Sequence, residues 1–203
     1  QLASIFFRWA PPGKGIELYG EYGREDFSAD VRDFMLEPDH SSTANIGFRK
    51  AWQKGLNITA LRGEFHNYEA PSSGRTRGEG LIYIHQPLVQ GHTYRGQLLG
   101  ANVGIGSGLA YLVAFERFTQ SGKLKVFTSR VTQREISARG PEYVTGEALE
   151  KPVEVQQSIG AELSRFVGTF DVSGRIILTS NMNRYFLADK SNANFALTVR
   201  QGF

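Results

Sequence analysis

The sequence predicts an all-β protein: an antiparallel up-and-down transmembrane β-barrel of about ten strands. Three observations predict it. Apolar and polar residues alternate with a period of two along several segments, of which residues 153–167 are the longest. The chain contains 23 glycines, and its longest apolar run, residues 109–115, is far too short for a membrane-spanning helix. Residues 194–203 alternate and end on Phe203, which is typical of the closing strand of a bacterial outer-membrane barrel.

The first two expected strands are residues 3–9 and 16–23, separated by two prolines and a glycine. The second strand alternates between an apolar face and a face that carries Glu17, Tyr19 and Glu21. Buried carboxylates are costly unless they are paired. These positions therefore predict an interior that is filled with water or braced by salt bridges.

The other expected strands follow in meander order, joined by hairpins and by longer connections. Counting back from Phe203, which belongs at the periplasmic end, places residues 136–152 outside the cell and residues 24–42 on the periplasmic side. We expect one domain over residues 1–203. The remaining strands are residues 44–52, 56–68, 81–85, 109–116, 124–135, 153–167, 175–187 and 194–203.

Composition excludes several classes of protein. The 23 basic and 20 acidic residues are scattered along the chain, a pattern too diffuse for a nucleic-acid partner. There is no cysteine, which excludes a disulfide scaffold, a thiolate metal site and a cysteine nucleophile. Because the chain begins on Gln1 with no signal core, we expect a processed chain or a fragment, and favour a fragment.

No motif predicts catalysis. The glycine-rich residues 104–108 are followed by neither Lys-Ser/Thr nor a helix, so a phosphate-binding loop is not expected. The four histidines lack metal-ligand spacing, so we expect no metal and no cofactor. There is no Gly-x-Ser-x-Gly elbow either. A hydrolase at the barrel rim stays open only because His85 and His92 lie near the end of an expected strand.

Two stretches carry a more specific signal. Residues 17–24 (Glu-Leu-Tyr-Gly-Glu-Tyr-Gly-Arg) with residues 32–41, and residues 90–100 (Gln-Gly-His-Thr-Tyr-Arg-Gly-Gln-Leu-Leu-Gly), resemble marked segments of the Wzi-type capsule assembly proteins of bacterial outer membranes. The resemblance covers residues 16–108, and beyond them only the barrel pattern is similar. It implies a barrel of about eighteen strands preceded by helices, of which this chain looks like the C-terminal portion.

The resemblance also implies a function: a non-enzymatic, lectin-like protein that retains capsular polysaccharide at the outer membrane, with lipid or lipopolysaccharide around it. Polysaccharide binding is expected in the connection that follows residue 90, where planar hydrogen-bonding groups and an aromatic ring occur together. The candidates are His92, Tyr94, Arg95, Gln97 and Asn102.

A second charged group allows a structural interpretation. Arg24, Arg32, Asp33 and Glu37 are expected to form ion pairs inside the barrel that brace a plug, because buried charges usually persist through pairing.

Alternatives remain open at this point. A porin or channel is indicated by the polar positions of the expected strands, which include Glu154, Glu162 and Arg200. A soluble barrel or sandwich is the structural alternative. Aromatic residues near strand ends favour a membrane, where they would form interfacial girdles: Trp9, Trp52, Tyr143 and Tyr185. The oligomeric state and the glycan are left open.

Overall fold

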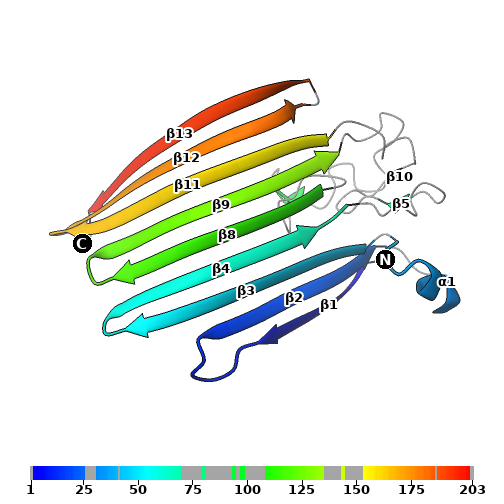
Figure 1. Ribbon diagram of the computed structural model, residues 1–203, viewed down its shortest axis with the longest axis horizontal. Helices are drawn as coiled ribbons and strands as arrows, with labels where there is room; N and C mark the ends of the chain where they lie inside the picture. Colours follow the sequence, from blue (N-terminus) through cyan, green and yellow to red (C-terminus); the bar gives the residue numbers. More distant parts are fainter. Residues whose placement is uncertain are drawn as a thin grey trace.

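The computed structural model describes residues 2–25, 31–40, 42–69, 79–80, 93–94, 97–98, 108–134, 143–144, 153–185 and 187–201. Its main feature is one antiparallel sheet of nine strands, each paired with its neighbours in chain order (Figure 1). The expected all-β antiparallel fold is confirmed, with nine strands in this sheet. They are β1 (Leu2–Trp9), β2 (Ile16–Glu25), β3 (Ser42–Lys54), β4 (Asn57–Asn67), β8 (Gly108–Thr119), β9 (Gly122–Arg134), β11 (Val153–Val167), β12 (Phe170–Arg184) and β13 (Ala188–Gln201).

Small elements accompany the sheet. The helix α1 (Val31–Leu36) follows β2, and no helix of the described segments is long and apolar enough to cross a membrane. Two-residue strands form two small pairs, β5 (Glu79–Gly80) with β10 (Tyr143–Val144) and β6 (Thr93–Tyr94) with β7 (Gln97–Leu98).

The order of strands differs from the expected order at one place. β4 pairs directly with β8 over ten residue pairs from Ile58↔Phe118 to Asn67↔Leu109, so no further strand of the main sheet stands between them. The strand expected at residues 81–85 lies outside the described residues. β1 and β13 are the two edges of the sheet, which is not closed.

The turns after β1, β3, β8 and β11 lie at one end of the sheet, and the long connections lie at the other end, together with the short turn between β12 and β13 (Figure 1). The turns after β3 and β11 are tight because Gly55 and Gly168 adopt positive φ angles of 59° and 61°. Long connections leave β2, β4 and β9 at the other end. Placing residues 24–42 at the end opposite residues 136–152 was therefore wrong, because the count included a strand between β4 and β8.

The two faces of the sheet differ in composition. Side chains alternate between faces along each strand, and the pairing register sorts them consistently across all nine strands. We call one face the apolar face; the large apolar residues exposed on it include Ile5, Phe7, Trp9, Leu18, Ile46, Phe48, Trp52, Phe65, Val113, Phe115, Leu124, Val126, Ile159, Leu163, Val167, Phe170, Ile176, Leu178, Phe195, Leu197 and Val199. The other is the polar face, with Arg8, Glu17, Tyr19, Glu21, Asn45, Arg49, Arg62, Glu64, His66, Glu116, Lys123, Lys125, Glu162, Arg175, Thr179, Asn192 and Arg200.

Burial is also one-sided. Most large side chains of the apolar face are exposed, the others are half-buried, and among the described side chains no large one is fully buried. Apart from Gly20, Gly63 and Gly122, the buried residues of the strands lie on the polar face, for example Ala60, Ala114, Glu116 and Ser158. Side chains crowd together on the inside of a curved sheet and spread apart on its outside. The polar face is therefore the concave side, and the apolar face is the convex side.

Four aromatic rings cover glycines on the neighbouring strand. Each ring and its glycine are direct partners in the register, and a side chain added at the glycine would overlap the ring. An aromatic residue opposite a glycine is a recognised way to stabilise a curved sheet. The pairs are Phe7 with Gly20, Tyr19 with Gly47, Phe48 with Gly63, and Phe127 with Gly160.

Candidate functional site

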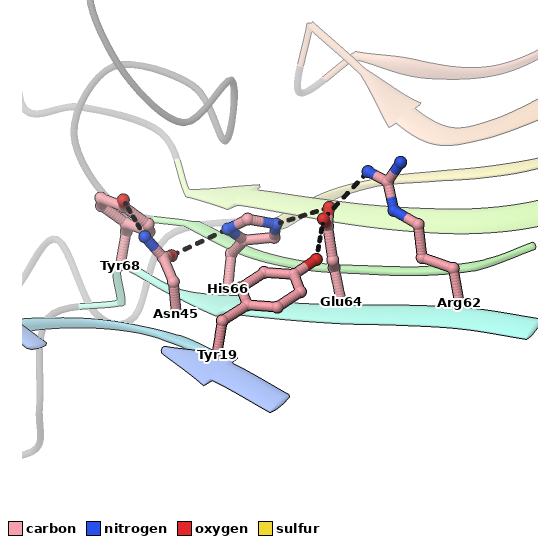
Figure 2. A network of polar contacts seen from close by, with 6 residues as sticks. All are labelled: Tyr19, Asn45, Arg62, Glu64, His66 and Tyr68. Atoms are coloured by element: carbon pink, nitrogen blue, oxygen red, sulfur yellow. Dashed lines mark hydrogen bonds and ion pairs between the residues drawn. The ribbon is translucent and has the colours of Figure 1, made fainter. Parts of the chain in front are cut away.

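The densest polar network on the polar face is centred on Glu64 of β4 (Figure 2). The hydroxyl of Tyr19 donates to Glu64 Oε1. Arg62 Nη2 lies 2.9 Å from the same oxygen, and His66 Nε2 lies 3.7 Å from Glu64 Oε2. The side chain of Glu64 is only 20% exposed, and the Tyr19 hydroxyl and the Arg62 guanidinium offset the cost of removing its charge from water.

The network continues from His66 to β3. His66 Nδ1 lies 2.8 Å from Asn45 Oδ1, and Asn45 Nδ2 donates to the hydroxyl of Tyr68 at 3.1 Å. Because the amide of Asn45 donates to Tyr68, its oxygen faces His66, so Nδ1 carries the proton. Tyr68 is buried, and the chain of contacts fixes the orientation of the imidazole (Figure 2).

The register explains why these residues meet. Tyr19, Gly47 and Glu64 form one row across β2, β3 and β4, while Asn45 and His66 are direct partners in the next row. Gly47 has no side chain, so the Tyr19 ring lies over it and its hydroxyl reaches β4. Residues far apart in the sequence are thus fixed on one surface by backbone pairing.

A shallow groove of about 470 Å³ extends from the network on β3 and β4 across β2 to β1. Arg8 Nε lies 2.5 Å from Glu17 Oε1 across these two strands. The groove combines an aromatic ring with donors and acceptors that bind hydroxyl groups. Its polar-face lining comprises Phe6, Arg8, Glu17, Tyr19, Glu21, Asn45, Glu64 and His66.

Charges alternate farther along the polar face. Glu116, Lys125, Glu162 and Arg175 follow one another in one register row across β8, β9, β11 and β12. Lys123 Nζ lies 2.9 Å from Glu116 Oε1. Opposite charges directly across strands attract each other, and the row of four carries no excess of one sign.

Of the five candidates expected to bind polysaccharide, two are placed by the structure. Tyr94 and Gln97 are direct backbone partners in the pair formed by β6 and β7. His92, Arg95 and Asn102 lie outside the described residues. Polysaccharide binding by the five stays a prediction.

The expected plug residues lie at the end with the long connections. The guanidinium carbon of Arg24 lies 5.2 Å from the centre of the Phe34 ring of α1, a cation–π contact. Glu37 Oε2 lies 3.9 Å from His40 Nδ1. Arg32 is exposed, and the side chain of Asp33 is outside the described part, so an ion-pair network of these residues stays a prediction.

Sequence reasoning missed most of the network. It placed Tyr19 on a polar face beside Glu17 and Glu21, but it did not select Asn45, Arg62, Glu64, His66 or Tyr68. The available signal was a polar residue at every second position of residues 62–68, alternating with Leu61, Gly63 and Phe65.

Comparison with known proteins does not place the chain in a family. No family model, no curated protein and no solved structure matches the chain. Within the described ranges, no group of three or more His, Cys, Asp or Glu residues is placed to hold a metal ion.

Proposed function

We propose that this sheet is part of the wall of a bacterial outer-membrane β-barrel, and that the protein holds capsular or extracellular polysaccharide at the cell surface without catalysis. The observation that carries the proposal is the convex apolar face, which is exposed across all nine strands. Water-soluble monomers rarely expose an apolar patch larger than a few hundred Å². A lipid bilayer is the environment that covers such a face.

Each strand has a segment of apolar side chains on the apolar face. The position of this segment shifts from one strand to the next, as expected when the strands of a barrel are tilted. On this face apolar side chains run from Ala3 to Trp9 on β1 and from Phe170 to Leu178 on β12, with Trp9 and Leu178 in one register row. The centre of the segment therefore moves by about one residue per strand. With a rise of about 3.3 Å per residue and a strand spacing of about 4.8 Å, the strands tilt by about 35° from the normal to the band, within the range of outer-membrane barrels.

Basic side chains of the apolar face reach toward its borders. At the end with the short turns, Lys50 Nζ donates to the backbone oxygen of Lys14, and Arg165 Nη1 donates to Ser121 Oγ. Long basic side chains that lie along an apolar surface and direct the charge to the interface are typical of membrane proteins. Trp9 and Trp52 are exposed near the same end, as in an aromatic girdle.

The connections favour one orientation. Outer-membrane barrels have short periplasmic turns and longer external loops. By this rule the long connections face outward, and with them α1 and the hairpin of Tyr94 and Gln97. This is the end at which a surface polymer would be met.

Retention of polysaccharide can be tested in cells. The gene that encodes this chain is deleted, and cell-bound and released polysaccharide are quantified. The proposal predicts that polymer synthesis continues while the polymer moves from the cells into the medium, and that a plasmid copy restores retention. An unchanged partition would exclude the retention function.

A channel is the second candidate, favoured by the alternating charges of Glu116, Lys125, Glu162 and Arg175 on the concave face. Steady conductance of the purified protein in planar bilayers would support it. Conductance that persists when the long connections are shortened would show that they do not block a pore.

A further inference from the structure

We propose that the concave polar face carries a saccharide-binding patch of its own on β1 and β2, in which Phe6 is the stacking platform and Glu21, Glu17 and Arg8 bind hydroxyl groups. The proposal rests on the proposed function and adds a contact surface for the polymer inside the wall, distinct from the external connections. Its ligand is an uncharged, hydroxyl-rich pyranose unit.

Phe6 is an exposed aromatic residue on the polar face of the edge strand β1. Its side chain is 79% exposed, whereas its neighbour Phe7 lies on the apolar face and covers Gly20. The register partner of Phe6 is Glu21, so its ring has no glycine to cover. An exposed aromatic ring among polar groups costs stability in water, and it gains contact area when the C–H face of a sugar lies against it.

Free hydrogen-bonding groups surround this ring. Among the described residues Glu21 forms no hydrogen bond or ion pair, and its side chain is exposed. Arg8 uses Nε to bind Glu17 at 2.5 Å, while its side chain remains 70% exposed. The guanidinium thus presents further N–H donors beside two carboxylates, a set that matches hydroxyl groups, which donate and accept.

The side chains at the floor of the patch are held by contacts with one another. Tyr19, Asn45, Glu64 and His66 line the groove and are bonded to one another in the network of Figure 2. A ligand would therefore bind without ordering these side chains, which lowers the entropic cost of binding. The volume of about 470 Å³ lies within the range of small-molecule sites.

Charge selects the ligand class. The lining of the groove holds three carboxylates, Glu17, Glu21 and Glu64, and one guanidinium, Arg8. Arg49, opposite Glu17, and Arg62, beside Glu64, lie outside the lining. A uronate or phosphate would meet an excess of carboxylates, whereas a neutral sugar meets acceptors for its hydroxyl protons.

The experiment uses the protein purified in detergent and the polysaccharide recovered from the medium of the deletion strain. Phe6→Ala and Glu21→Gln are compared with Ile5→Ala, a change on the same strand and the opposite face where Ile5 is 71% exposed. We expect each patch variant to bind about tenfold more weakly and to release polymer from cells. Ile5→Ala should bind as the unchanged protein does, and affinity should be insensitive to NaCl.

The outcomes separate the two proposals. If deletion releases polymer but both patch variants retain and bind it normally, the patch is refuted and the retention function stands. If deletion releases none, the retention function fails. Binding that disappears at high salt would contradict an uncharged ligand. Equal losses in Phe6→Ala and Ile5→Ala, with an intact Glu21→Gln, would show a general folding effect and refute the patch.

Discussion

The hydroxyl of Tyr19 on β2 donates a hydrogen bond to Glu64 on β4 across Gly47, the residue of β3 that lies between them. The three residues form one register row, and the absence of a side chain at Gly47 lets the phenol ring span two strand spacings. A backbone feature of one strand therefore determines a side-chain contact between its two neighbours.

Substitution of Gly47 should break this contact. In Gly47→Ala the new methyl group would overlap the Tyr19 ring, so Tyr19 must leave Glu64. We expect a loss of about 1–3 kcal/mol in the free energy of unfolding, measured by urea titration of the protein in lipid vesicles. Gly174→Ala is the matched control, since no atom lies within 4 Å of the added carbon, and it should be neutral or slightly stabilising.

Removal of the Glu64 carboxylate should lower the free energy of unfolding more than removal of one of the groups that donate to it. Tyr19→Phe leaves Arg62 and His66 on Glu64 and should cost about 1 kcal/mol. Glu64→Leu leaves Arg62 and Tyr19 with no acceptor and should cost about 3 kcal/mol. The same unfolding titration measures both, and equal costs would show that Glu64 is not the centre of the network.

The ion pair of Glu116 and Lys123 should contribute modestly to the free energy of unfolding. Their side chains are 12% and 30% exposed, and the contact is 2.9 Å. A double-mutant cycle with Glu116→Gln and Lys123→Met should give a coupling energy of about 0.5–1 kcal/mol. If water fills the concave side, this coupling energy should be smaller in 1 M salt. A coupling energy that does not change with salt would argue against a water-filled interior.

A charge should be tolerated on one face and not on the other. Leu163 lies near the middle of the apolar segment of β11, and Ser164 follows it on the polar face. Leu163→Arg should destabilise the protein in lipid by about 2–4 kcal/mol, whereas Ser164→Arg should change the free energy of unfolding by less than about 1 kcal/mol. Equal effects would contradict the assignment of faces.

The strands could be predicted because alternation is local. Residues 153–167, expected from apolar residues at every second position, coincide with β11, and the polar positions of β2 were assigned to the correct face. Pairing register is not local. Glu64 and Tyr19 are 45 residues apart, and only the observed pairing of β2 with β3 and of β3 with β4 brings them together. Counting a further strand of the sheet between β4 and β8, which pair directly, inverted the side assigned to residues 24–42.

The central claim is that the convex apolar face contacts lipid. The chain has no cysteine, so single cysteines at Ala161, Glu162, Leu163 and Ser164 can each carry a spin label without background. In lipid vesicles, labels at positions 161 and 163 should collide with dissolved oxygen more than with a water-soluble nickel complex, and labels at positions 162 and 164 should show the reverse. If positions 161 and 163 favour the nickel complex, or are shielded from both reagents as in a dry core, the lipid-facing wall is contradicted.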